Sequence, residues 1–244
     1  MQEKRQDIHN SDVPALCRAC EARHNGICGA LRDDELLRLS KHTTVKNVPA
    51  GSPLIGEEES VATYANVLKG VVKLTKLMAD GRQQIVGLQF APDFVGRPFQ
   101  EASQVGAEAA SDVTLCIFPK GSLDAMLKEQ PNLEHRLLRQ SLNELDEARE
   151  WMLTLGRKTA EEKVASFLYM IAAHIDPESD VDAENTATFD LPLTRADIAD
   201  FLGLTIETVS RQLTRLRKAG AIEITTNRHV IVPDMQALRD LSGS

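Results

Sequence analysis

The sequence contains no long apolar segment. In its 244 residues, no apolar run approaches the roughly 20 residues that a membrane-spanning helix needs. The first seven residues are mostly polar or charged, and no apolar stretch typical of a secretory signal follows them. We therefore expect a cytoplasmic protein with no membrane partner.

The short motifs of common catalytic sites are also missing. There is no glycine-rich phosphate loop, and the six histidines do not form a metal-binding motif. The composition, 42% apolar and 26% charged, is that of a globular chain long enough for one large domain or two smaller ones. These absences favour a binding protein over an enzyme.

Positive charge is scarce overall but concentrated in one segment. The net charge of −8 argues against a protein that coats nucleic acid without selection. Residues 206–219, however, contain four basic side chains and one acidic one, Glu207. The basic residues are Arg211, Arg215, Arg217 and Lys218. Local charge of this kind is compatible with specific DNA binding.

Residues 194–218 predict a helix-turn-helix. Thr194 is a good N-cap, Gly203 accepts the left-handed turn that ends a helix, and Thr205 caps a second helix. Residues 221–233 predict two short strands around a polar turn, which form a wing. A helical hairpin in a globular core is the alternative, but the wing and the basic helix end favour a DNA-binding module.

The second predicted helix has two distinct faces. Its apolar face consists of Ile206, Val209, Leu213 and Leu216, and its outward face of Glu207, Ser210, Arg211 and Thr214. We predict that Arg211 binds guanine, that Glu207 accepts from cytosine or a neighbouring amino group, and that Ser210 tunes base preference. Thr205, Thr208 and Arg215 complete the predicted DNA-binding set. Arg215, Arg195 and Arg228 are expected at phosphates, with solvated surface arginines as the alternative.

Short strands and then helices precede this module. Residues 43–120 contain several short strand patterns, with a hairpin turn at 79–81, and predict a small β-sandwich or barrel. A long helix is expected over residues 131–155, ending before Gly156. Its apolar residues have nearly heptad spacing: Leu138, Leu142, Leu145, Met152 and Leu155. This spacing favours a parallel homodimer helix, and the alternative is a helix packed on its own domain.

Three of the four cysteines lie close together. Cys17, Cys20 and Cys28 fall in an otherwise irregular segment, residues 1–30, and Cys116 lies in the last predicted strand. A structural disulfide is not expected in the cytosol, so the clustering indicates a metal or redox role. Spacing alone leaves zinc and an iron–sulfur cluster open. His24 is a possible further ligand, but we expect a solvated loop histidine.

The order of sheet domain, long helix and winged helix-turn-helix resembles the Crp/Fnr superfamily of bacterial transcription regulators over nearly the whole chain. The resemblance implies an α+β fold with an N-terminal cyclic-nucleotide-binding-like β-roll. The expected parts are a cysteine-rich segment (1–30), the β-roll (31–130), a dimerisation helix (131–156) and the DNA-binding domain (157–244).

Two motifs resemble the Fnr-type, oxygen-responsive subgroup. One is the Glu-x-x-Ser-Arg pattern at 207–211, which in that subgroup reads a TTGAT half-site. The other is the cysteine arrangement, although its gap between Cys20 and Cys28 resembles the wider-spaced variant. The resemblance implies an oxygen-labile [4Fe-4S] cluster on Cys17, Cys20, Cys28 and Cys116. It also implies that the cluster promotes dimerisation and binding to TTGAT-N4-ATCAA-like sites without oxygen, activating or repressing genes.

The resemblance bears on other partners as well. Nucleotide-binding members need an arginine for the cyclic phosphate, and residues 104–110 contain none, while Arg97 directly follows Gly96. We therefore expect no cyclic nucleotide. The turn at Asp80–Gly81 resembles a loop that contacts RNA polymerase in family activators, or it is a plain exposed turn. Alternative functions are sensing nitric oxide or general redox state with the same DNA site, or a zinc-stabilised regulator.

Overall fold

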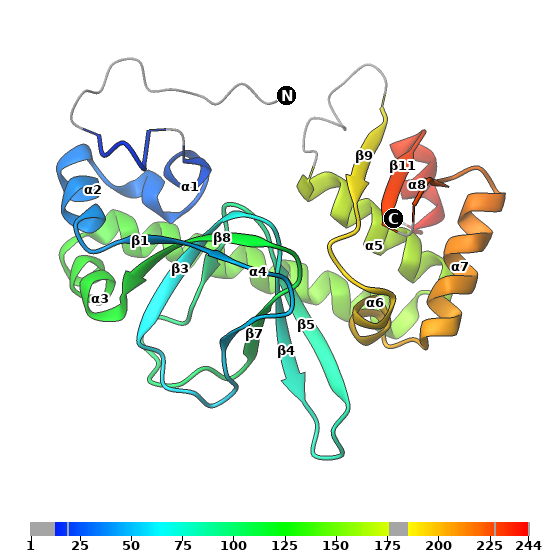
Figure 1. Ribbon diagram of the computed structural model, residues 1–244, viewed down its shortest axis with the longest axis horizontal. Coiled ribbons are helices and arrows are strands. Elements are labelled where there is room, and N and C mark those ends of the chain that lie inside the picture. Colours follow the sequence, from blue (N-terminus) through cyan, green and yellow to red (C-terminus); the bar gives the residue numbers. More distant parts are fainter. Residues whose placement is uncertain (1–12, 19, 176–184, 227, 244) are drawn as a thin grey trace. The chain divides into compact units, whose positions relative to one another are not determined.

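The computed structural model describes residues 13–18, 20–175, 185–226 and 228–243 (Figure 1). The chain divides into two compact units. The first unit contains residues 1–76 and 87–145, and the second contains residues 77–86 and 146–244. No helix in the described ranges is both long enough and apolar enough to cross a membrane.

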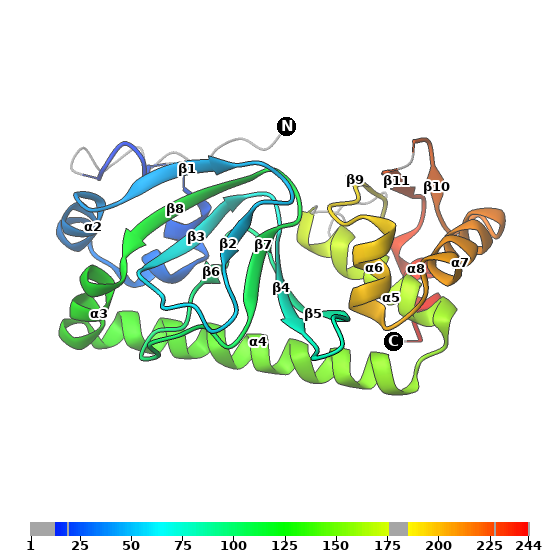
Figure 2. The same cartoon turned by 60° about the horizontal axis from the view of Figure 1, so that its bottom comes forward.

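Two four-stranded sheets form the roll, which belongs to the first unit except at residues 77–86, the ends of β4 and β5 and the turn between them (Figure 2). One has the order β1 (Thr44–Val48), β8 (Val113–Pro119), β3 (Thr63–Lys69) and β6 (Phe94–Val95). The other has the order β2 (Pro53–Ile55), β7 (Gly106–Ala109), β4 (Val72–Leu77) and β5 (Gln83–Gln89). The β1-β8-β3-β6 sheet is antiparallel throughout. The predicted β-structure is confirmed, and the structure adds the strands β1, β6 and β7.

The β1-β8-β3-β6 sheet is covered on both faces. Successive residues of a strand point to opposite faces. Val67 and Leu115 therefore enter a core with Val72 and Ala109 of the other sheet. Their neighbours on the opposite face, which we call the outer face, include Tyr64 and Phe118, and these belong to a second core cluster. The outer face thus needs its own cover.

Helices supply that cover. They are α1 (Glu21–His24), the 3-10 helix η1 (Ile27–Ala30), α2 (Asp33–Ser40), α3 (Lys120–Glu129) and the start of α4 (Pro131–Arg157). Four of them contribute Ile27, Leu36, Leu123 and Leu133 to the second cluster, and α1 packs against β3. The expectation that residues 1–30 are irregular is wrong for 21–24 and 27–30, because packing on the sheet stabilises helices too short to form alone. Residues 1–12 and 19 lie outside the described residues.

Helix α4 continues through Gly156 and ends at Arg157, so the predicted end before Gly156 is wrong. A single glycine costs a helix only about 1 kcal/mol, which the rest of a long helix tolerates. The predicted hairpin turn is confirmed, with Met78 N–H donating to Arg82 C=O at 2.8 Å and Gly81 at φ 85°.

The second unit contains α5 (Ala160–Ile175), α6 (Arg195–Leu202), α7 (Ile206–Lys218), α8 (Met235–Leu241) and a small sheet. The strands of that sheet are β10 (Glu223–Ile224), β11 (His229–Val232) and β9 (Ala187–Asp190), in that order. The ring of Phe201 packs on Trp151 and Phe167, at centroid distances of 4.5 and 5.9 Å. Residues 176–184, which precede β9 in the sequence, lie outside the described residues.

Candidate nucleic-acid interface and candidate metal centre

Helices α6 and α7 are bounded by the predicted caps. The Thr194 hydroxyl accepts from Asp197 N–H at 3.1 Å, and the Asp197 carboxylate accepts from Thr194 N–H at 3.1 Å. Gly203 ends α6 in the left-handed conformation, with φ 61°. The Thr205 hydroxyl then accepts from Thr208 N–H at 3.2 Å. The helix-turn-helix prediction is confirmed, and Asp197 completes a capping box that the sequence reasoning missed.

The two faces of α7 largely follow the prediction. Val209, Leu213 and Leu216 are buried. The predicted outward residues are all exposed: Glu207, Ser210, Arg211 and Thr214. Ile206 is 48% exposed, so its predicted place on the buried face is wrong, because the first turn of α7 extends beyond the packed core.

The first turns of α7 combine an acceptor with a donor. Hydrogen bonds from its own backbone N–H and from Thr205 lower the pKa of Glu207, so this side chain is a carboxylate. Arg211 lies one turn further on, and its guanidinium contacts the Thr208 hydroxyl at 3.4 Å. A carboxylate and a planar fork of donors at i and i+4 share one exposed side of the helix. This pair has the chemistry needed to read base edges, and its contacts with DNA stay a prediction.

The expected phosphate-contacting arginines have different surroundings. Arg215 forms an ion pair with Glu161 of α5 at 3.1 Å, which competes with a phosphate. Arg195 is half-buried; burial, and then the like charge of Arg228, lower its pKa. Arg195 at the start of α6 and Arg228 beside the wing therefore lie within electrostatic reach of each other. Two neighbouring guanidinium groups favour an anion between them.

The predicted wing is confirmed and is larger than expected. Strands β10 and β11 pair antiparallel, with Ile224 opposite Val230. Strand β9 adds to the far edge of β11, with Phe189 opposite Val230. His229 and Asp190 approach to 2.8 Å across these strands.

The four cysteines come from three places in the first unit, and none forms a disulfide. Cys17 ends a turn in which its N–H donates to Pro14 C=O at 2.8 Å, and Cys20 N–H donates to Cys17 C=O at 3.4 Å. Cys28 lies in η1 and packs against the second core cluster. Cys116 lies in β8, opposite Asn66 of β3 and on the same outer face.

The cysteine thiols influence one another. Burial raises the pKa of Cys28 most, followed by the charges of Cys116, Cys20 and Cys17. Burial, with Cys20 and Cys17, raises the pKa of Cys116 to about 12. Burial and then Cys20 raise the pKa of Cys17, although Arg23 acts in the opposite direction. The four sulfur atoms therefore lie within electrostatic reach of one another, and a metal group must displace protons to bind them.

These thiols do not converge on one point. Among the described residues, no three Cys, His, Asp or Glu side chains lie close enough together to hold a single metal ion. His24, expected to be a solvated loop residue, instead ends α1, and its Nε2 is buried with no hydrogen-bond partner in the described ranges. The expectation of a solvated histidine is therefore wrong, because α1 packs against β3.

The cysteine segment also contacts the start of α4. The guanidinium of Arg136 donates to Asn25 C=O at 2.5 Å. Ile27, directly before Cys28, is buried in the same core cluster as Leu133 and Leu137 of α4. The sequence reasoning missed Arg136 and Asn66, because only the fold shows that they are neighbours of the cysteines.

Further along α4, an apolar face is exposed. Leu138, Leu142, Leu145 and Met152 are 45–73% exposed, as is Leu153, which was not predicted. Leu155, predicted to share this face, is half-buried. At about 100° per residue, Leu155 lies away from the direction of the other four. The described contacts leave this face uncovered within one chain.

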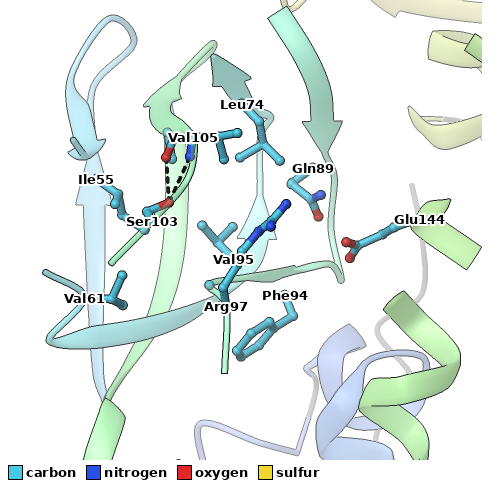
Figure 3. A pocket seen from close by; sticks show the side chains of 12 residues that line it. Ile55, Val61, Leu74, Gln89, Phe94, Val95, Arg97, Ser103, Val105 and Glu144 are labelled. Atoms are coloured by element: carbon cyan, nitrogen blue, oxygen red, sulfur yellow. Dashed lines mark hydrogen bonds between the residues drawn. The ribbon is translucent and has the colours of Figure 1, made fainter. Parts of the chain in front are cut away.

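A cavity of about 60 Å³ lies inside the roll of the first unit (Figure 3). Its lining includes Leu74, Gln89, Arg97 and Glu144, and Ser103, whose hydroxyl donates to Val105 C=O at 2.6 Å. Pockets for small molecules usually measure roughly 300–1,000 Å³, far more than this cavity. The expectation that no cyclic nucleotide binds stays a prediction.

A winged helix-turn-helix that follows a β-roll and one long helix defines a class of protein, the DNA-binding regulators. Comparison with known proteins agrees. Residues 45–130 match the cyclic nucleotide-binding domain, and residues 162–241 match the Crp-like helix-turn-helix domain. The chain is 55% identical to a probable transcriptional activator of Rhizobium leguminosarum bv. viciae over 98% of both chains. It is 40% identical to the transcriptional activator protein FnrL of Cereibacter sphaeroides over 95% of both.

A solved structure shows the same fold. FixK2 from Bradyrhizobium japonicum superposes with a TM-score of 0.72 at 31% identity, covering 83% of this chain and 98% of FixK2. This chain therefore belongs to the Crp/Fnr family, and it is a DNA-binding transcription regulator, not an enzyme. The predicted fold and family are confirmed.

Proposed function

We propose that this regulator responds to oxygen through a [4Fe-4S] cluster held by Cys17, Cys20, Cys28 and Cys116. The observation that carries the proposal is that the fold gathers these four thiols on the outer face of one sheet, beside the start of α4. When bound, the cluster supplies the oxygen-labile link between the N-terminal segment and the sheet.

The donor set fits a cluster. Four thiolates are the usual ligands of a [4Fe-4S] group, which spreads them over four irons. A tetrahedral zinc ion would instead draw four sulfurs to about 4 Å from one another. Four thiols within electrostatic reach of one another supply this donor set, and measuring iron and sulfide distinguishes the cluster from zinc.

The cysteine segment is placed to influence α4. Arg136 of α4 holds the carbonyl of Asn25, and Ile27 packs with Leu133. Ordering the segment therefore favours one placement of the first turns of α4, and loosening it removes these contacts. This is a two-state element biased by a ligand.

The exposed face of α4 suits a second copy of the chain. Four large apolar side chains on one side of a helix disfavour a monomer in water. A two-fold homodimer would present two copies of α7 to half-sites one helical turn apart. We propose that Glu207, Ser210 and Arg211 of each copy read a TTGAT half-site within TTGAT-N4-ATCAA, and that the hairpin at Asp80–Gly81 contacts RNA polymerase at activated promoters.

The test is to purify the protein without oxygen, and to measure iron, sulfide, visible absorption and affinity for a TTGAT-N4-ATCAA duplex before and after air is admitted. We expect iron and sulfide, an absorption band that bleaches in air, and weaker binding afterwards. A duplex with scrambled half-sites is the control. Protein without iron or sulfide that binds equally well in air would contradict the proposal. Bleaching by nitric oxide but not by air would point to the alternative signal.

A further inference from the structure

Asn66 is a polar side chain in an apolar setting. It lies in β3 and is 1% exposed. Its strand neighbour on the same face, Tyr64, belongs to the second core cluster, as does Phe94, which is opposite Asn66 in β6. Burying a carboxamide costs free energy unless hydrogen bonds compensate. The partners of Asn66 therefore need an explanation.

The amide of Asn66 is directed at a cysteine. Its Nδ2 donates to Cys28 Sγ at 3.3 Å. Its Oδ1 has no hydrogen-bond partner among the described residues. A neutral thiol is a weak acceptor, whereas a sulfur with negative charge accepts a stronger hydrogen bond. The amide would therefore hold a Cys28 sulfur bound to a metal group more strongly than a free thiol.

Asn66 also connects the two parts of the cysteine set. In the sheet it is directly opposite Cys116, with both side chains on the outer face. It therefore forms a hydrogen bond with Cys28 of the N-terminal segment and is the cross-strand neighbour of Cys116 in β8.

We propose that Asn66 is a positioning residue of the cysteine site, which donates to the Cys28 thiolate and so slows the loss of the bound group. The inference rests on the proposed cluster. A hydrogen bond to a ligand sulfur holds the ligand in its binding rotamer and stabilises its charge, and loss of such a partner typically lowers metal affinity about 10- to 100-fold.

The experiment measures how fast an iron chelator removes iron from the anaerobic, cluster-loaded full chain. We compare the wild type with Asn66→Leu, which keeps the volume but removes the donor, and with the smaller Asn66→Ala. The matched control is Gln89→Leu, because Gln89 is also a buried amide whose oxygen has no partner in the described part of the chain, but it lies in β5 of the other sheet. Thermal unfolding of the metal-free proteins measures the purely structural cost.

We expect both Asn66 variants to lose iron about tenfold faster than the wild type, whereas Gln89→Leu loses iron at the wild-type rate. Asn66 variants that release iron no faster than wild type or Gln89→Leu would overturn the inference and leave the cluster in place. A wild-type protein that takes up no iron and sulfide would instead refute the proposed function, and the inference would fall with it. If Asn66→Leu does not fold, the comparison rests on Asn66→Ala.

Discussion

The helix-turn-helix and the cysteine site differ in how the chain builds them. All the caps and the turn of the DNA-reading part lie within residues 194–208, and each is satisfied by a neighbour three residues away or by a left-handed glycine. The cysteine site joins a short N-terminal segment to β8, far away in the sequence. Its four cysteines come within electrostatic reach of one another only because helices cover the outer face of the sheet.

This difference has a consequence for regulation. Local hydrogen bonds cap α7 independently of the distant sheet, so the oxygen signal that we propose need not act on α7 itself. The non-local cysteine site depends on packing and, in our proposal, on a bound cluster, which would make it the part that a signal loosens. Five changes test this division, from the largest expected effect to the smallest.

Removing one thiol should abolish the response while leaving the DNA-binding unit folded. In Cys116→Ser, we expect loss of most iron and sulfide, because three thiolates do not complete the ligand set. Anaerobic affinity for the duplex should fall to the value measured in air. Thr114→Ser, two residues away on the same strand, is the control. Full iron content and an intact oxygen response in Cys116→Ser would refute the assignment of this ligand.

A negative charge on the exposed face of α4 should weaken DNA binding without affecting the cysteine site. We expect Leu142→Glu to be monomeric with its cluster retained, because pairing would bury a carboxylate. Affinity for the two-fold duplex should fall by roughly 100-fold or more once the half-sites are bound independently. Sedimentation and binding measurements check this. Asn143→Glu, about 100° around the helix, should remain dimeric. Tight binding by a monomeric Leu142→Glu would show that the face is not needed.

A substitution in α7 should weaken DNA binding and leave the cysteine site unaffected. Arg211→Ala is expected to weaken binding by about 1–3 kcal/mol and to relax preference at one base pair, since a bidentate contact is lost. Binding to duplexes with single base changes measures this, and bleaching in air should match the wild type. Arg217→Ala, an exposed arginine nearer the end of α7, should not change base preference. An unchanged preference profile in Arg211→Ala would argue against base contact.

Because a local hydrogen bond caps α7, loss of the Thr205 hydroxyl should have a modest effect on stability. Thr205→Ala removes the hydroxyl that accepts from Thr208 N–H and should lower the free energy of unfolding by about 1 kcal/mol. Thr205→Ser keeps the acceptor and should cost less. Urea unfolding followed by circular dichroism checks both. Equal stability of Thr205→Ala and the wild type would mean that tertiary packing, not the cap, fixes the start of α7.

The smallest change concerns Arg215. If it reaches a phosphate on DNA, Arg215→Ala should reduce the slope of log affinity against log salt by about 0.9 without altering base preference. The ion pair with Glu161 competes with that contact, so Glu161→Gln should strengthen binding slightly. A salt slope unchanged in Arg215→Ala would assign this arginine to the ion pair alone.

Several features were predictable because local chemistry decides them. The caps at Thr194 and Thr205, the turn at Gly203 and the hairpin turn at Gly81 each follow from neighbouring residues. Strand β7 was missed because Gly106–Ala109 has low strand propensity, and it forms by pairing with strands on both sides. The exposure of Ile206 and the burial of His24 Nε2 were also missed, since both depend on distant packing.

The sequence by itself determined the order of the parts, the capped helices and the four cysteines, because periodicity and caps act over a few residues. Only the tertiary structure decided which distant segments contact one another. Burial of the outer face brings Cys28 to Cys116 and directs Asn66 at the sulfur of Cys28, and the same core places Ile27 beside Leu133. Contacts between distant segments depend on how whole faces are covered, and no short stretch of sequence records that.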